Sequence, residues 1–380
     1  ENFIMKKKIA IIGSGIAGLT LGNLLKKNSQ ISFKIYERED GLVIKEGYGI
    51  QLSVNCISIL RDLDFDLIDK KKMYHPQKLN FFSIANNKIC DLDLTKFNTK
   101  NNKYTTLRRS VLVEFLREKL FKENLKFNKE IKKISELKDK ILINFTDNTN
   151  DLVDYLFVCD GIFSNTKKII EKKPPLPEFS KAFAIRSIVK SSDVTEIDSH
   201  NISLFMGSKS HVVTYPINQK GELNVVCIIR SNQKNIDDPK DFLEKHIFNQ
   251  SKKLKNLFKN QLEVWPIYVN DKLFKSPNKK IFYLGDSLHA MLPSMAQGAA
   301  QSIEGAYELY SLLNKNIKNF EDIYYETRFK KIKLIKKRSK INYFAFHLSN
   351  NFFKKIRNFM LRKLVKNEKF LKSYLGKVYN

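Results

Sequence analysis

Cysteine and histidine are both scarce in this chain, with four and six copies among 380 residues. The cysteines (Cys56, Cys90, Cys159 and Cys227) stand far apart and form neither a Cys-x-x-Cys pair nor the spacing of a zinc site. No two histidines have the spacing of a helical metal-ligand pair, so the sequence predicts no metal site. Because a disulfide framework is also missing, we expect a reducing, cytoplasmic setting.

Glycine is sparse too, at 14 residues, and four of these glycines lie in the one long uncharged apolar run, residues 9–25. A run of this length has the composition of a membrane span or a signal region. However, Gly13, Gly15 and Gly18 punctuate it at the spacing of a tight turn. We therefore expect a buried strand, a turn and a helix in this segment.

Acidic residues are outnumbered, because 68 Lys and Arg against 40 Asp and Glu leave a net charge of +28. A positive field of this size attracts anions such as carboxylates, phosphorylated cofactors, acidic membranes and nucleic acid. The lysines are scattered along the chain, and no nucleic-acid-binding motif accompanies them. The chain is rich in Lys, Asn and Ile together, as AT-biased coding would produce, so the charge can be a matter of composition. The sequence thus predicts no nucleic-acid partner.

Within this apolar run, residues 13–18 read Gly-Ser-Gly-Ile-Ala-Gly, which is a dinucleotide-binding fingerprint between a strand and a helix. Gly13 allows the tight turn, Gly15 lets the backbone approach a pyrophosphate, and Gly18 lets the helix pack closely on the strand. The anion then rests on the amides at the start of the helix. The predicted loop contacts also include Ile16 and Ala17.

An acidic residue follows the second strand at the position that the fingerprint requires. Glu37 stands there, and a carboxylate at this place can accept hydrogen bonds from both ribose hydroxyls of an adenosine. Its neighbour Arg38 belongs to the same predicted site. No second fingerprint occurs in the sequence, so one dinucleotide has a dedicated site and any other must bind without one.

The order of predicted elements indicates an α/β protein. Strands at 7–12 and 32–36 flank a helix that reaches about residue 27, and this βαβ start implies a parallel sheet. Between residues 182 and 229, strands follow one another at regular spacing, as in an antiparallel or mixed sheet. We expect a discontinuous Rossmann-type dinucleotide domain formed by residues 1–73, 101–178 and 275–330. A substrate domain, residues 74–100 and 179–274, is inserted into it, and residues 331–380 form C-terminal helices.

Three further stretches resemble the FAD-dependent aromatic hydroxylases typified by p-hydroxybenzoate hydroxylase, most closely their salicylate-hydroxylase-like branch. In residues 107–112, Arg109 stands where the family has an arginine that opens a helix. Residues 159–164 contain the Asp-Gly segment, and residues 285–304 contain the Gly-Asp motif with the helix that follows it. Lys167, where the family usually has arginine, and Gly305, where it usually has aspartate, are departures from the pattern.

The resemblance implies that the dedicated dinucleotide is FAD, and that NADH or NADPH binds only transiently as a co-substrate. The Gly-Asp aspartate would bind the ribityl chain, and the next helix would direct bare amides at the pyrimidine edge of the flavin. The implied cofactor contacts are Arg109, Asp160, Gly161, Gly285, Asp286, Pro293, Gln297, Gly298 and Ala299.

The chemistry that the resemblance implies is hydroxylation of a small aromatic, anionic substrate. Reduced nicotinamide reduces the flavin, O₂ adds to form a flavin hydroperoxide, and the substrate attacks its distal oxygen. A base or a hydrogen-bond partner for the phenol is useful, and histidine suits either role. His211 and Tyr215 share one face of a predicted strand at period two, and they are the candidate catalytic residues. Gln51 and Pro293 are the candidate substrate contacts.

Two apolar features have a structural and a functional interpretation. The single tryptophan, Trp265, could line a pocket, but we favour a core position. The C-terminal stripe Phe352, Phe353, Ile356, Met360 and Leu364 is flanked by basic residues; it could lie on a membrane, but we expect it to dock on its own domain.

Two other functions stay open at the level of the sequence. The first is a membrane-associated flavoenzyme of quinone or isoprenoid metabolism, which would meet lipid substrates through the C-terminal helix. The second is a non-catalytic flavin-binding protein, which would carry FAD without substrate-stimulated oxidation of nicotinamide. The sequence is consistent with a monomer or a homodimer.

Overall fold

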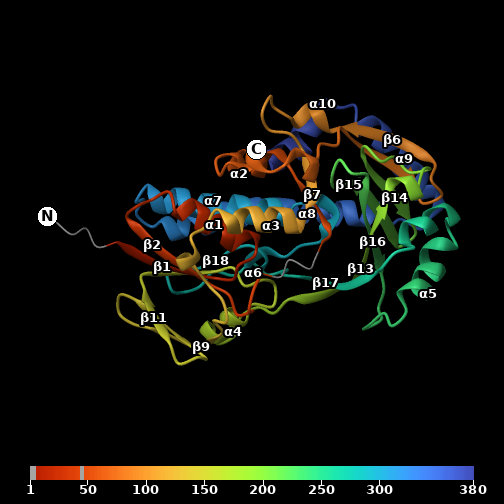
Figure 1. The fold of residues 1–380 in the computed structure, drawn as a ribbon. Helices are drawn as coiled ribbons and strands as arrows, with labels where there is room; N and C mark the ends of the chain where they lie inside the picture. The colour runs from red at the N-terminus through yellow and green to blue at the C-terminus, as the bar shows by residue number, and fades with distance from the viewer. Residues whose placement is uncertain (1–5, 43–46) are drawn as a thin grey trace.

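A five-stranded parallel sheet forms one end of the molecule in the computed structural model, which describes residues 6–42 and 47–380 (Figure 1). Its strand order is β18 (Ile281–Tyr283), β12 (Tyr155–Val158), β1 (Lys7–Ile12), β2 (Ile31–Tyr36) and β8 (Leu125–Lys126). Residues Ile9 to Ile12 of β1 are all buried, as expected for a strand covered on both faces. The apolar run of the sequence is therefore β1 followed by helix α1 (Ile16–Leu25).

A seven-stranded mixed sheet forms the other end (Figure 1). Its order is β17 (Glu263–Val269), β13 (Glu178–Lys190), β16 (Glu222–Arg230), β15 (Ser210–Pro216), β14 (Ile202–Gly207), β5 (Lys78–Ser83) and β6 (Lys88–Asp93). All neighbours are antiparallel except β14 and β5. Two smaller sheets complete the strands: β11 (Asn150–Val153), β10 (Ile141–Phe145), β9 (Ile131–Glu136); and β3 (Gly49–Leu52), β7 (Thr105–Arg108), β4 (Met73–Tyr74).

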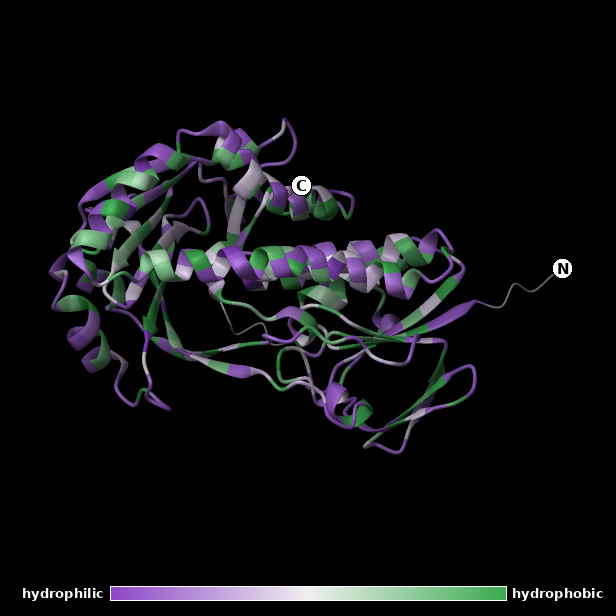
Figure 2. Cartoon of the chain, turned by 180° about the vertical axis from the view of Figure 1, so that it is seen from behind, coloured by the Kyte–Doolittle hydropathy of each residue, from purple (hydrophilic) through white to green (hydrophobic). Residues whose placement is uncertain are grey.

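The two long helices α7 (Gly298–Asn314) and α8 (Phe320–Phe346) run from the parallel sheet toward the mixed sheet (Figure 1). Hydrophilic and hydrophobic residues alternate along the helices in Figure 2, as expected for helices with one packed face. The remaining helices are α2 (Val54–Arg61), α3 (Arg109–Glu118), α4 (Asn165–Ile170), α5 (Pro239–Leu243), α6 (Asp286–His289), α9 (Asn351–Leu364), α10 (Glu368–Leu371) and α11 (Lys377–Tyr379). No helix within the described ranges is long and apolar enough to span a bilayer.

The structure corrects two of the sequence expectations. Trp265 lies on β17, the edge strand of the mixed sheet, and its side chain is 42% exposed, so it is not a core residue. The C-terminal apolar stripe is not packed into a core either, because Phe352, Phe353 and Met360 of α9 stay exposed. Its inner face instead buries Arg357, whose guanidinium donates to the carbonyl of Ala345.

Candidate functional site: two cavities bordered by one segment

A cavity of about 550 Å³ opens at the carboxyl ends of the parallel strands. Ligands of open α/β sheets bind at this edge, because the loops after neighbouring strands converge there. The cavity lies between the β1–α1 turn, the ends of β2 and β12, the turn after β18 and the start of α7. Its lining includes Gly13, Ser14, Gly15, Ile16, Ala17, Glu37, Arg38, Arg109, Asp160, Gly161, Arg186, Gly285, Asp286, Gly298 and Ala299.

The three glycines of the fingerprint differ in what a side chain at each position would contact. Gly13 has φ +102°, and a Cβ there would lie 2.5 Å from the carbonyl oxygen of Cys159. A Cβ on Gly18 would lie 2.0 Å from the carbonyl oxygen of Gly13, so this glycine lets α1 approach the turn. A Cβ on Gly15 would meet nothing within 4 Å, because Gly15 faces the cavity. Only Gly15 therefore leaves open space where a ligand can approach the backbone.

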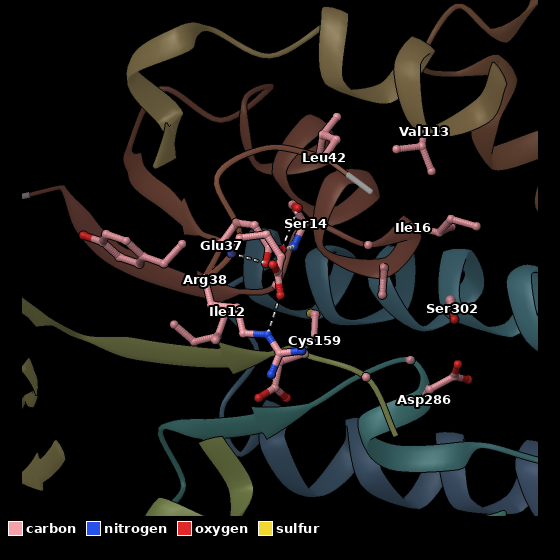
Figure 3. A pocket seen from close by; sticks show the side chains of 18 of the residues that line it. Ile12, Ser14, Ile16, Glu37, Arg38, Leu42, Val113, Cys159, Asp286 and Ser302 are labelled. Atoms are coloured by element: carbon pink, nitrogen blue, oxygen red, sulfur yellow. Dashed lines mark hydrogen bonds and ion pairs between the residues drawn. The ribbon is translucent and has the colours of Figure 1, made fainter. Parts of the chain in front are cut away.

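Two carboxylates belong to opposite sides of this cavity (Figure 3). Glu37 accepts hydrogen bonds from the backbone amide and the hydroxyl of Ser14, at 2.9 and 2.7 Å. Asp286 begins α6, and its carboxylate faces the cavity. Desolvation by the surrounding protein raises the pKa of Asp286, and the positive charge of Arg109 opposes this shift. Both acids are placed to accept hydrogen bonds from the hydroxyl groups of a bound molecule.

Two helix N-termini also face the cavity. Neither α1 nor α7 has a side-chain cap or an acidic residue in its first turn. Their first-turn amides and the positive ends of their dipoles are therefore available to an anion. A Cβ on Gly298 would meet nothing within 4 Å, so the start of α7 is as accessible as the start of α1. The buried Oδ1 of Asp160 is unpartnered among the described residues and is a further acceptor at this site.

These donors and acceptors fit an FAD. The amides of α1 suit its pyrophosphate, the carboxylates of Glu37 and Asp286 suit its hydroxyl groups, and the amides of α7 suit the flavin edge where negative charge gathers.

Three predicted cofactor residues lie elsewhere. Gly18 packs against the turn, and the buried Gln297 donates to the hydroxyl of Ser53 at 2.9 Å. Pro293 lines a second cavity.

That second cavity, of about 600 Å³, lies between the mixed sheet and the C-terminal helices, and its lining is mainly apolar. It contains both predicted substrate residues, Gln51 and Pro293, together with His211. Its other members include Leu79, Phe81, Leu92, Leu204, Val213, Met295, Phe344, Phe353, Ile356, Arg357 and Met360. One short segment, residues 293–299, borders both cavities, because Pro293 to Ala296 line the second cavity and Gly298 and Ala299 line the first.

The two predicted catalytic residues have different surroundings. His211 is buried, and its Nδ1 lies 2.6 Å from Nε2 of His347. Tyr215 points to the same side of β15, but its hydroxyl donates to the carbonyl of Gly49 at 2.8 Å. Tyr215 lines neither cavity. This contact gives Tyr215 a role in joining the mixed sheet to β3 and corrects the expectation that its phenol faces the substrate.

Arg186 is a member of the first cavity that the sequence reasoning missed. It lies on β13 of the mixed sheet, and its guanidinium stands over the ring of Tyr48 at 5.8 Å. Its buried Nε has no hydrogen-bond partner in the described part of the chain. The sequence feature that could have indicated it is a single cation in the middle of an otherwise uncharged predicted strand, residues 182–189.

The sequence profile of the family described as "FAD binding domain" matches residues 6–322. The chain belongs to this family. It is an FAD-dependent monooxygenase of the aromatic-hydroxylase type, as the resemblance implied. A salicylate hydroxylase of Pseudomonas putida is 24% identical, with 80% of this chain and 77% of the relative aligned. The 6-hydroxynicotinate 3-monooxygenase of Bordetella bronchiseptica is also 24% identical, over 79% of this chain and 81% of that protein.

Two solved structures confirm the predicted fold class. Klebsiella pneumoniae HpxO, complexed with FAD and uric acid, superimposes with a TM-score of 0.87 at 16% identity, covering 100% of this chain and 98% of that chain. A substrate complex of salicylate hydroxylase gives a TM-score of 0.81 at 18% identity, covering 99% and 97%.

Proposed function

We propose that this protein hydroxylates a small aromatic compound in the second cavity, with FAD in the first cavity and with NAD(P)H and O₂ as co-substrates. The observation that carries the proposal is the shared segment 293–299, which borders both cavities. A flavin whose edge is held at the start of α7 would then face a substrate beside Pro293. Bound FAD supplies the redox chemistry, because it takes hydride from NAD(P)H and activates O₂.

The chain itself positions the reactants and excludes water. Gly15 and the first turn of α1 hold the pyrophosphate, while Glu37 and Asp286 hold hydroxyl groups of the cofactor. The apolar walls of the second cavity keep bulk water from the reacting ring. Because no second dinucleotide fingerprint exists, NAD(P)H would bind only for the reduction step.

The lining supports a largely apolar substrate more than an anionic one. Arg357 is its one cationic side chain among the described residues, and that guanidinium already donates to the carbonyl of Ala345 at 3.0 Å. A buried carboxylate without a partner would be costly in such surroundings. We therefore propose a substrate whose ring is held by apolar contact, with His211 and Gln51 as its polar contacts.

The test begins with the purified protein, which should be yellow and should release FAD when it is denatured. Small aromatic compounds, neutral and anionic, are then screened for stimulated oxidation of NADH and of NADPH, with hydroxylated product measured alongside. Product formation with one compound class supports the proposal. Bound FAD without stimulation by any compound would favour the non-catalytic flavin carrier.

A second candidate function is oxygenation of a lipid-dissolved substrate at a membrane surface. It is favoured by the exposed residues Phe353, Ile356 and Met360 of α9, which also line the second cavity. Basic residues of the same helix, including Arg362 and Lys363, are exposed nearby. Flotation with anionic and with neutral vesicles tests this candidate, because protein that stays with neither vesicle argues against it.

A further inference from the structure

Polar groups are few in the second cavity, and several of them are already paired within the protein. The Tyr104 hydroxyl donates to Gln51 at 2.8 Å, and the Tyr374 hydroxyl donates to Asn342 at 2.8 Å. His211 is different. Its ring is only 2% exposed and lines the cavity, and Nε2 has no hydrogen-bond partner among the described residues. This nitrogen is left for a molecule inside the cavity.

His211 is the last member of a hydrogen-bonded chain of three residues. Arg230, at the end of β16, donates from Nε to Nδ1 of His347 at 2.9 Å. His347 follows α8, and its Nε2 lies 2.6 Å from Nδ1 of His211 on β15. The ring of Tyr343 holds the first two members, with its centroid 4.6 Å from the Arg230 guanidinium and 4.3 Å from the His347 ring.

The direction of this chain follows from which groups can donate. A guanidinium has only donors and stays protonated, so Nδ1 of His347 must accept. A neutral imidazole carries one N–H, which for His347 is then on Nε2 and donates to Nδ1 of His211. By the same rule, the N–H of His211 is on Nε2. The reverse direction would leave His347 without any ring proton, as an imidazolate.

A protonated imidazole does not fit the chain either. A proton on Nδ1 of His211 would face the N–H of His347 across 2.6 Å. Burial lowers the pKa of His211 to about 3, and the charge of Arg230 acts in the same direction. Burial, followed by His211 and Arg230, lowers the pKa of His347 as well. Both rings are therefore neutral at pH 7, and each has one defined tautomer.

We propose that Arg230 and His347 lock His211 as a hydrogen-bond donor into the second cavity, and that the cavity therefore selects apolar ring compounds that offer an acceptor oxygen of the carbonyl type. His211 is not a general base while the chain is intact, because Nδ1 already accepts from His347 and Nε2 already carries a proton. Arg230 and His347 are positioning residues, whereas His211 touches the substrate. The selection of substrate rests on the proposed function of this cavity.

The tautomers are measured directly in the FAD-loaded full chain with ¹⁵N-labelled histidine. Two-bond and three-bond ¹H–¹⁵N correlations at pH 7 identify which ring nitrogen is protonated, and the variants His211→Phe and His347→Gln assign the signals. We expect a protonated Nε2 in both rings of the unmodified protein. In Arg230→Met the single tautomer of His347 should be lost, whereas Arg230→Lys, which keeps a donor, should restore it. A protonated Nδ1 or a cationic ring at His211 would overturn the proposal.

The ligand class is tested with two probes of the same shape, 2-acetylnaphthalene and 2-isopropenylnaphthalene, which differ in one carbonyl oxygen. Perturbation of the flavin absorbance reports binding. We expect the acetyl compound to bind about 3- to 10-fold more tightly, the worth of one neutral hydrogen bond, and His211→Phe to remove this preference. Equal affinity in the unmodified protein would overturn the donor role. If neither probe binds, both the proposed function of the cavity and its proposed ligand class are refuted. The NMR experiment tests the tautomers independently of this result.

Discussion

Gly15 and Gly18 belong to one six-residue segment, but we expect alanine at the two positions to have different effects. Gly15→Ala should impair cofactor binding, whereas Gly18→Ala should impair folding. The backbone at Gly15 is extended, with φ −75° and ψ −176°, so alanine is allowed there. A Cβ at this position meets nothing within 4 Å, whereas a Cβ at Gly18 lies 2.0 Å from the carbonyl oxygen of Gly13. The first methyl group therefore enters the cavity, and the second enters packed backbone.

The two magnitudes follow from these contacts. Overpacking of this kind costs about 1–3 kcal/mol, so Gly18→Ala should lower the free energy of unfolding of the apoprotein by at least this amount. Gly15→Ala should leave that free energy within about 0.5 kcal/mol of the unmodified value. It should instead displace the pyrophosphate from the α1 amides. Loss of one charge-assisted hydrogen bond, worth about 1.5–3 kcal/mol, weakens FAD binding by about 10- to 150-fold.

Urea unfolding of the three apoproteins gives the first quantity, and titration of flavin fluorescence gives the second. The matched pair makes the outcome clear, because both changes add the same methyl group, one at the N-cap and one in the first turn of α1. The reasoning is refuted if Gly15→Ala destabilises the apoprotein as much as Gly18→Ala does. It is equally refuted if Gly15→Ala binds FAD as tightly as the unmodified chain.

Three further changes test other parts of the structure. Asp286→Ala should weaken FAD binding by about 10- to 150-fold, through loss of a charge-assisted hydrogen bond; unchanged affinity in the fluorescence titration would show that the Gly-Asp motif does not contact the cofactor. Arg328 is fully buried and pairs with Glu304 and Glu308 at 3.1 and 3.2 Å. Arg328→Met should therefore cost about 3–5 kcal/mol of unfolding free energy, and a loss below about 1 kcal/mol in urea would contradict this. Burial lowers the pKa of His289 to about 3, below the value of about 6.5 in an unfolded chain. The unfolded state thus binds the extra proton, and stability falls as the pH falls below about 6.5, by about 2 kcal/mol from this residue at pH 5. The difference in urea midpoint between pH 7 and pH 5 should be smaller in His289→Phe, and an equal difference would exclude His289 as the cause.

Local sequence was sufficient to predict the glycine turn and the parallel sheet beside the first cavity. The requirements at Gly13, Gly15 and Gly18 concern the backbone of one turn, and a short fingerprint encodes such a turn completely. Alternation of strand and helix identified the parallel sheet for a similar reason, because side-chain period and length distinguish buried strands from helices. The loops of a parallel sheet converge at one edge, so motifs far apart along the chain could be assigned to one cavity.

The rest of the site depends on which segments the tertiary structure brings together. His211 and His347 are separated by 136 positions, and nothing in the local sequence around either histidine indicates the other. Arg186 reaches the first cavity only because β13 extends from the mixed sheet toward the parallel one. An apolar pattern shows that a residue can be buried, but the order of strands decides what covers it. That order leaves Trp265 on an edge, and α9 buries Arg357 while most of its apolar stripe stays exposed.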